Sequence, residues 1–117
     1  MPGRHPRLAS FVHAARGLAV LLRQPNAWLH LVAAAIVVAL AAYLQVSPGE
    51  WLALILAIAL VLAAEALNTA IEHVVDIASP EWSALARDAK DVAAAGVLIC
   101  AIGALGIGLI VFVPRLI

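Results

Sequence analysis

Three long apolar stretches, separated by short polar segments, dominate the pattern of side chains along this chain of 117 residues. They run over residues 28–46, 51–75 and 92–113, and each approaches the roughly 20 residues that a helix needs to cross the core of a bilayer. Together they account for most of the sequence. The pattern predicts a single all-α integral membrane domain over residues 1–117, with three transmembrane helices.

A different pattern precedes the first apolar stretch. Apolar residues recur at helical spacing from Leu8 to Leu22, which predicts an amphipathic helix over 7–23 that lies in the membrane interface. Pro25 interrupts this helix, and we expect Asn26 to cap the next one. The arginines of the segment fall off the apolar stripe and suit anionic headgroups: Arg7, Arg16 and Arg23.

Two polar turns connect the apolar stretches. Residues 47–50 read Ser-Pro-Gly-Glu, in which Ser47 and Glu50 have the spacing of a capping box. Because this hairpin is very short, the first and second spans are expected to be antiparallel neighbours. Ser79 and Pro80 offer a second cap and first-turn proline, which predicts a helix that begins at Ser79 and continues into the third span.

The composition agrees with a membrane environment, since 66% of the residues are hydrophobic and 12% are charged. Lysine plus arginine equals aspartate plus glutamate, and no basic strip interleaved with aromatics occurs, so we expect no nucleic-acid partner. So small a protein has little interior of its own. An enclosed polar site therefore needs neighbouring protomers, and we expect a homo-oligomer.

The basic residues predict the orientation of the spans. Four arginines precede the first span, Arg87 and Lys90 lie between the second and third spans, and the first hairpin carries no lysine or arginine. By the positive-inside rule, the N-terminus and the second loop are expected to be cytoplasmic. Arg115, at the far end of the third span, is the exception.

Polar residues interrupt the last third of the second span. At about 100° per residue they fall within an arc of about 100° and over a rise of about 16 Å. A charge near mid-membrane costs on the order of 3 kcal/mol, so a buried Glu65 needs an interior partner, a water-filled cavity or a proton. Helix packing alone would need only the amide and the hydroxyl, so the carboxylates favour a functional site. The stripe consists of Glu65, Asn68, Thr69, Glu72 and Asp76.

The chemistry of this stripe suits a metal and a nucleotide. Clustered carboxylates repel one another unless a cation lies among them, and hard oxygen ligands suit Mg²⁺. The stripe descends from the second loop into the membrane, where ATP in water can meet a lipid hydroxyl. A cluster at its mouth mixes cations for phosphate oxygens with further carboxylates, although a set of snorkelling interfacial side chains is the alternative interpretation. The cluster consists of Arg87, Asp88, Lys90 and Asp91.

From about Ser10 to Val113, the sequence resembles the prokaryotic diacylglycerol kinase family, which includes the undecaprenol kinases. Residues 65–76 are similar to the family signature E-x-L-N-[ST]-[AS]-I-E-x-x-V-D, and residues 89–91 fit its A-K-D motif. Residues 76–82 look like the undecaprenol-kinase branch. The resemblance implies an ATP- and Mg²⁺-dependent lipid kinase, a multi-pass homotrimer of the bacterial inner membrane with sites formed between protomers.

The resemblance also implies roles for individual residues. Glu65 would be the general base that faces the lipid hydroxyl, Asn68 would support the site, and Glu72 would hold Mg²⁺ on ATP. Residues expected near the nucleotide are His13, Glu72, Glu81, Trp82, Ser83, Lys90 and Asp91.

The chain departs from the family before the first span. Where characterised members place a second magnesium-binding glutamate, this chain has Gln24-Pro25. A glutamine carbonyl oxygen ligates Mg²⁺ without charge, so we expect weaker metal binding, with Gln24 as a doubtful second ligand.

The acceptor and the catalytic competence stay open at this point. Diacylglycerol, which would yield phosphatidic acid, is the first acceptor expected, and undecaprenol is the alternative because both present a primary hydroxyl at the interface. A non-catalytic oligomeric membrane protein, either an ion pathway along the acidic stripe or a scaffold, is the competing class. The missing second glutamate is its best support.

Overall fold

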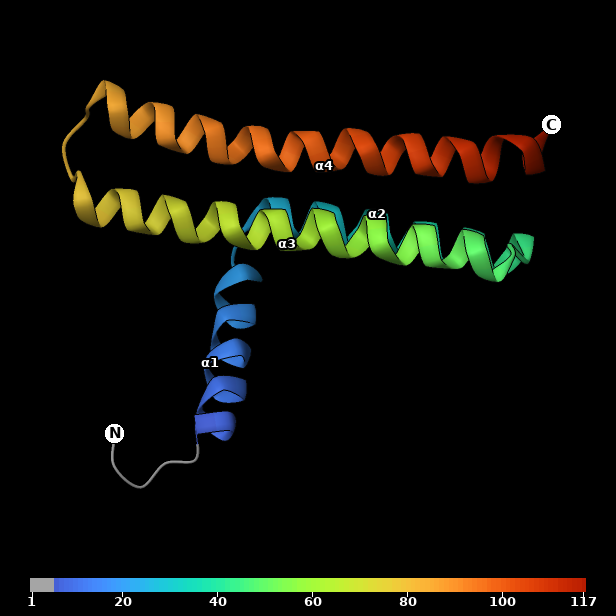
Figure 1. Cartoon of the computed structure of the whole chain (residues 1–117), viewed down its shortest axis with the longest axis horizontal. Coiled ribbons are helices and arrows are strands. Elements are labelled where there is room, and N and C mark those ends of the chain that lie inside the picture. Colours follow the sequence, from blue (N-terminus) through green and yellow to red (C-terminus); the bar gives the residue numbers. More distant parts are fainter. Residues whose placement is uncertain (1–5) are drawn as a thin grey trace.

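The computed structural model describes residues 6–117, and the regular elements within this range are all helices. They are α1 (Pro6–Leu21), α2 (Pro25–Leu44), α3 (Pro48–Ala78) and α4 (Ala84–Leu116). Helices α3 and α4 lie side by side, α2 packs against α3, and α1 projects away from the other three (Figure 1). Helices α2, α3 and α4 are each long and apolar enough to cross a membrane. The predicted all-α fold with three candidate spans is thereby confirmed.

The turn between α2 and α3 is fixed at both of its ends. Helix α2 ends at Leu44 because Gln45 adopts the left-handed conformation, with φ 53° and ψ 53°; the helix is thus shorter at this end than the stretch predicted to reach residue 46. On the other side, Ser47 N–H donates to Glu50 Oε1 at 2.9 Å and Glu50 N–H donates to Ser47 Oγ at 3.2 Å. The capping box read from the sequence is confirmed.

Two expected helix starts are wrong by a few residues. Helix α2 begins at Pro25 with Gln24 at the N-cap, so Asn26 lies inside the helix and caps nothing. Ser79 ends α3, because its N–H still donates to the carbonyl of Val75 at 2.8 Å. The N-cap of α4 is Ser83 instead, whose hydroxyl oxygen accepts a hydrogen bond from Ala86 N–H at 3.0 Å.

The apolar core lies at the end of the bundle that contains the short turn. It consists of small and large side chains from α2, α3 and α4 and the turn: Ala41, Val46, Leu54, Val111 and Phe112. At the same end, the Arg115 guanidinium donates to the Glu50 carboxylate, with Nε at 3.2 Å from Oε2.

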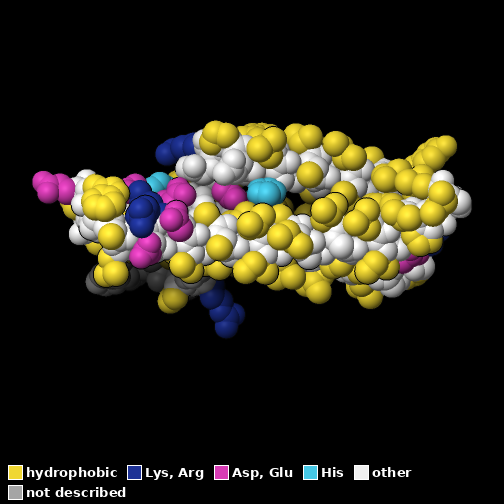
Figure 2. Space-filling view, turned by 90° about the horizontal axis from the view of Figure 1, so that it is seen from above, with side chains coloured by type: hydrophobic (Ala, Val, Ile, Leu, Met, Phe, Trp, Pro, Cys, Tyr) yellow, Lys and Arg dark blue, Asp and Glu magenta, His cyan; other side chains and the backbone are white. Residues whose placement is uncertain are grey.

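Charged and apolar side chains occupy different parts of the surface. In Figure 2 most Asp, Glu, Lys and Arg side chains gather toward the end that contains the α3–α4 loop, and hydrophobic side chains cover most of the remaining face. Many large apolar residues are exposed on the outward faces of the three long helices. Such a surface suits a bilayer as the solvent.

Candidate active site

One face of α3 is buried along most of the helix, and its chemistry changes halfway. Buried residues recur at spacings of three and four, first apolar and then polar. They are Leu54, Ala57, Val61, Glu65, Asn68 and Thr69. The same side of the helix that packs in the core therefore carries the polar stripe predicted from the sequence.

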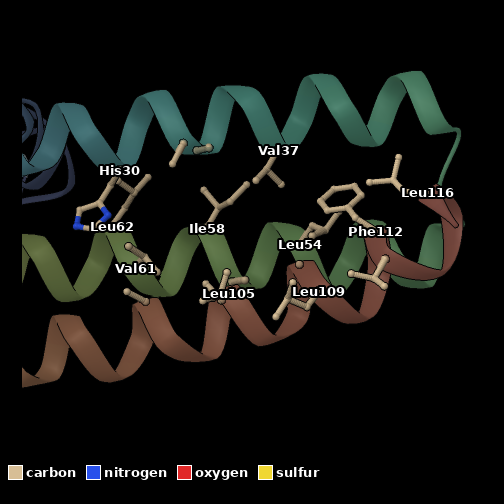
Figure 3. A pocket seen from close by; sticks show the side chains of 17 residues that line it. His30, Val37, Leu54, Ile58, Val61, Leu62, Leu105, Leu109, Phe112 and Leu116 are labelled. Atoms are coloured by element: carbon tan, nitrogen blue, oxygen red, sulfur yellow. The ribbon is translucent and has the colours of Figure 1, made fainter.

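Glu65 lies at the point where the stripe turns polar, and it is only 3% exposed. Its Oε2 lies 3.6 Å from Nε2 of His30, which α2 contributes from the opposite side. His30 also lines one end of an apolar cavity of about 470 Å³ between α2, α3 and α4 (Figure 3). The interior partner that a buried Glu65 requires is thus a histidine of the first span.

Sequence reasoning missed His30. The signal was present, because an ionisable residue inside an apolar span is by default a functional candidate. The polar stripe lies within α3 and does not indicate a partner on another helix. The packing of α2 on α3 brings the imidazole to the carboxylate.

One turn further along α3, Asn68 and Glu72 form a second polar pair. Asn68 Nδ2 donates to Glu72 Oε1 at 3.4 Å, whereas Asn68 Oδ1 is buried without a hydrogen-bond partner within residues 6–117. Thr69 is occupied differently, since its hydroxyl donates to the carbonyl of Glu65 at 3.0 Å. An orphaned amide oxygen beside a carboxylate is a pair of hard oxygen donors, which fits Mg²⁺.

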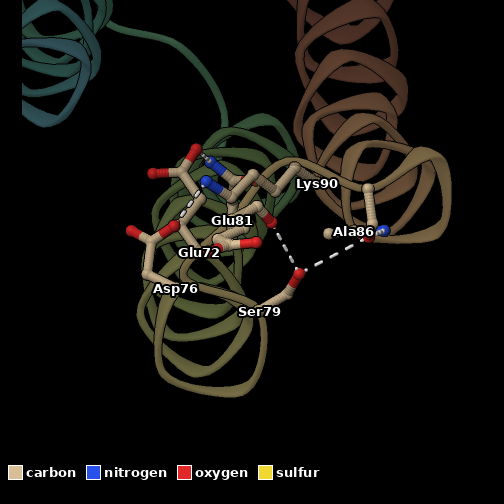
Figure 4. A network of polar contacts seen from close by, with 8 residues as sticks. Glu72, Asp76, Ser79, Glu81, Ala86 and Lys90 are labelled. Atoms are coloured by element: carbon tan, nitrogen blue, oxygen red, sulfur yellow. Dashed lines mark hydrogen bonds and ion pairs between the residues drawn. The ribbon is translucent and has the colours of Figure 1, made fainter.

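At the end of the stripe, Lys90 of α4 donates from Nζ to Oδ1 of Asp76 on α3 at 2.6 Å (Figure 4). This pair borders a cavity of about 260 Å³ beneath the α3–α4 loop. Two of its lining residues contact each other, since the Arg87 guanidinium lies 6.0 Å from the centre of the Trp82 ring. Most of the residues expected near the nucleotide line this one cavity: Glu81, Trp82, Ser83, Lys90 and Asp91.

Glu72 does not line this cavity but lies one turn before Asp76 on the same helix, and two other expected residues lie apart from it. His13 is on α1, which projects from the bundle, and Gln24 lies at the joint between α1 and α2. Within the part of the chain that the structure describes, no three His, Cys, Asp or Glu side chains come together as a metal site. One chain thus gathers the loop cavity and the Glu65–Glu72 stripe, but not the whole predicted site.

Comparison with known proteins identifies the family of this chain. Residues 12–112 match the family described as prokaryotic diacylglycerol kinase. The chain is also 40% identical to the undecaprenol kinase of Bacillus subtilis (strain 168) over 108 residues, which cover 92% of this chain and 88% of that relative. The chain belongs to the prokaryotic diacylglycerol kinase family and is a multi-pass membrane lipid kinase, with a lipid and ATP as its substrates.

Proposed function

We propose that this kinase transfers the γ-phosphoryl group of Mg²⁺-ATP to the primary hydroxyl of undecaprenol, at the cytoplasmic face of a bacterial inner membrane. The observation that carries the proposal is Glu65, a buried carboxylate within 3.6 Å of the histidine that lines one end of an apolar cavity. A lipid whose apolar chain lies in this cavity would place its hydroxyl group beside the polar part of α3.

Each polar cluster has a separate task in this reaction. Glu65 takes the proton of the lipid hydroxyl while the lipid oxygen bonds to the γ-phosphorus and the bond to ADP breaks. Glu72 and the Asn68 carbonyl oxygen would hold Mg²⁺, which supplies charge neutralisation on the phosphates when bound. Lys90, exchanging Asp76 for a phosphate oxygen, would position the nucleotide.

A homotrimer is part of the proposal. The apolar outward faces of α2, α3 and α4 leave room for neighbouring copies, and His13 and Gln24 lie apart from the loop cavity of their own chain. A neighbouring protomer would bring such residues to the site and supply the remaining metal ligand. The cytoplasmic position of the N-terminus and the α3–α4 loop follows from the distribution of arginine and lysine.

The choice of acceptor rests on likeness. The relative from Bacillus subtilis bears the name undecaprenol kinase, and the loop after α3 resembles that branch of the family. Diacylglycerol is the competing acceptor, since the matched family is described by that activity. Both are primary alcohols attached to apolar chains.

The test is transfer of labelled γ-phosphate by the purified protein in mild detergent, with undecaprenol and diacylglycerol in parallel at several Mg²⁺ concentrations. We expect phosphorylation of undecaprenol at the higher kcat/KM, and its loss in Glu72→Ala. Faster transfer to diacylglycerol would reverse the assignment of the acceptor. Absence of transfer to either lipid at high Mg²⁺ would favour a non-catalytic relative.

A further inference from the structure

We propose that His30 receives the proton that Glu65 removes from the acceptor and passes it to water, so that the base is ready for the next turnover. His30 acts on the reaction through Glu65, by accepting its proton. The inference rests on the proposed function, in which Glu65 is the base.

The first argument is burial. A base that takes a proton in each turnover must lose it again, yet the Glu65 side chain is only 4% exposed. The His30 side chain is 24% exposed, so the ring has one part against Glu65 and another part accessible. His30 thus lies between a buried carboxylate and the surface of the single chain.

The second argument is that no other route is visible in the part of the chain that the structure describes. His30 is the single ionisable partner within ion-pair distance of Glu65 in residues 6–117. Glu72, on the same helix, is about 10 Å further along the axis and is paired with Asn68. The apolar cavity that His30 lines receives only Ala, Gly, Leu, Val and Phe side chains from α4.

The proton balance is simple. The lipid hydroxyl loses its proton to the Glu65 carboxylate as the new O–P bond forms and the γ-phosphorus–ADP bond breaks. The carboxylic acid then donates that proton to Nε2 of the neutral imidazole, which leaves a carboxylate beside an imidazolium. The imidazolium releases a proton to water, so no net charge accumulates at the buried position. The distance of 3.6 Å exceeds a hydrogen bond, so the transfer requires the carboxylate and the imidazole to move closer together.

A proton relay can be distinguished from other roles of His30 by whether its loss slows the first turnover or only the later ones. Glu65 starts deprotonated, so loss of His30 leaves the first phosphorylation intact and slows the following ones. If His30 only orients Glu65 or packs the cavity, its loss slows the first turnover as well. If His30 binds the acceptor, its loss raises the KM for the lipid.

The experiment is rapid-quench phosphorylation by His30→Gln, with undecaprenol as acceptor. We expect a burst of one phosphorylated lipid per site at a rate within about twofold of wild type, followed by a kcat lowered about tenfold or more. His73→Gln is the matched control, because it removes an exposed histidine of α3, and it should behave as wild type.

Chemical rescue provides a second readout in His30→Ala. Added imidazole should restore steady-state kcat, whereas pyrazole, a ring of the same size but a far weaker base, should not. Rescue by both rings would identify cavity filling and overturn the relay. A slowed first turnover, an unchanged kcat, a rise in lipid KM alone, or an equal effect of His73→Gln would also overturn it. If wild-type protein phosphorylates neither lipid, the proposed function itself fails.

Discussion

The two ends of the α3–α4 pair contain the same kind of contact in different surroundings. At one end the Glu50 carboxylate of α3 pairs with Arg115 of α4, and at the other the Asp76 carboxylate of α3 pairs with Lys90 of α4. The first pair adjoins the apolar core, whereas the second borders the cavity beneath the loop.

The difference in exposure explains what each pair is suited to do. The side chains of Glu50 and Arg115 are 26% and 33% exposed, while those of Asp76 and Lys90 are 61% and 40% exposed. Solvent-exposed ion pairs contribute little to stability, so Lys90 can leave Asp76 for a phosphate at small cost. One end therefore fastens the two helices together, and the other keeps its charges available.

The largest effect should come from the residue at which the buried face of α3 changes from apolar to polar. We predict that Glu65→Gln lowers kcat by about a thousandfold, because an amide of the same shape accepts no proton from the lipid. Size-exclusion chromatography should show an unchanged oligomer. Near-normal turnover in this variant would remove Glu65 from the role of base.

The second-largest loss of activity should come from the exposed Asp76–Lys90 end of the α3–α4 pair. Lys90→Met should lower kcat/KM for ATP by about a hundredfold, because the nucleotide loses a cation for its phosphate oxygens. The melting temperature in detergent should change little. Arg87→Met serves as a control for loss of a cation at the same loop, with a smaller expected effect; equal losses would mean that general positive charge, not Lys90 itself, matters.

A gain is expected from a residue at the joint between α1 and α2. Gln24 makes no side-chain capping hydrogen bond, so its replacement removes no cap from the start of α2. We predict that Gln24→Glu lowers the Mg²⁺ concentration for half-maximal rate several-fold, because a carboxylate binds the cation more strongly than an amide. An unchanged Mg²⁺ requirement would contradict a role for this position in metal binding.

The smallest effect on turnover should come from the end at which Glu50 pairs with Arg115. Glu50→Ala removes both the partner of Arg115 and the side-chain acceptor of the capping box, so we expect a melting temperature lower by a few degrees. Turnover below the transition should remain within about twofold of wild type. A large loss of kcat at unchanged stability would show that the two ends are not functionally separate.

The sequence was informative wherever the signal was local. The spacing of Glu65, Asn68 and Thr69 predicted one buried polar face, and the spacing of Ser47 and Glu50 predicted the capping box, because both patterns lie within a single helix. The start of α4 was harder to place. Ser79 and Ser83 are both good caps, and the choice between them depends on whether the Ser79 N–H completes α3.

Contacts between helices lay beyond the sequence. The pairing of His30 with Glu65 joins residues of two different spans, and their rotation about the helix axes decides whether the side chains meet. The pairing of Arg115 with Glu50 is similar, and it explains why a cation at this end need not oppose the predicted orientation. In the proposed trimer, His13 and Gln24 would reach the site only from neighbouring copies, which a single chain does not contain.

The short turn between α2 and α3 has a consequence for chemistry at a distance. Only Gln45, Val46 and Ser47 separate the two helices, and left-handed Gln45 and the capping box fix both exits. His30 lies about 21 Å from this turn along α2, yet its register against Glu65 is set there. One residue inserted within α2, between His30 and the turn, would rotate the imidazole by about 100° about the helix axis and carry it off the carboxylate. The turn therefore fixes the register of the two antiparallel helices.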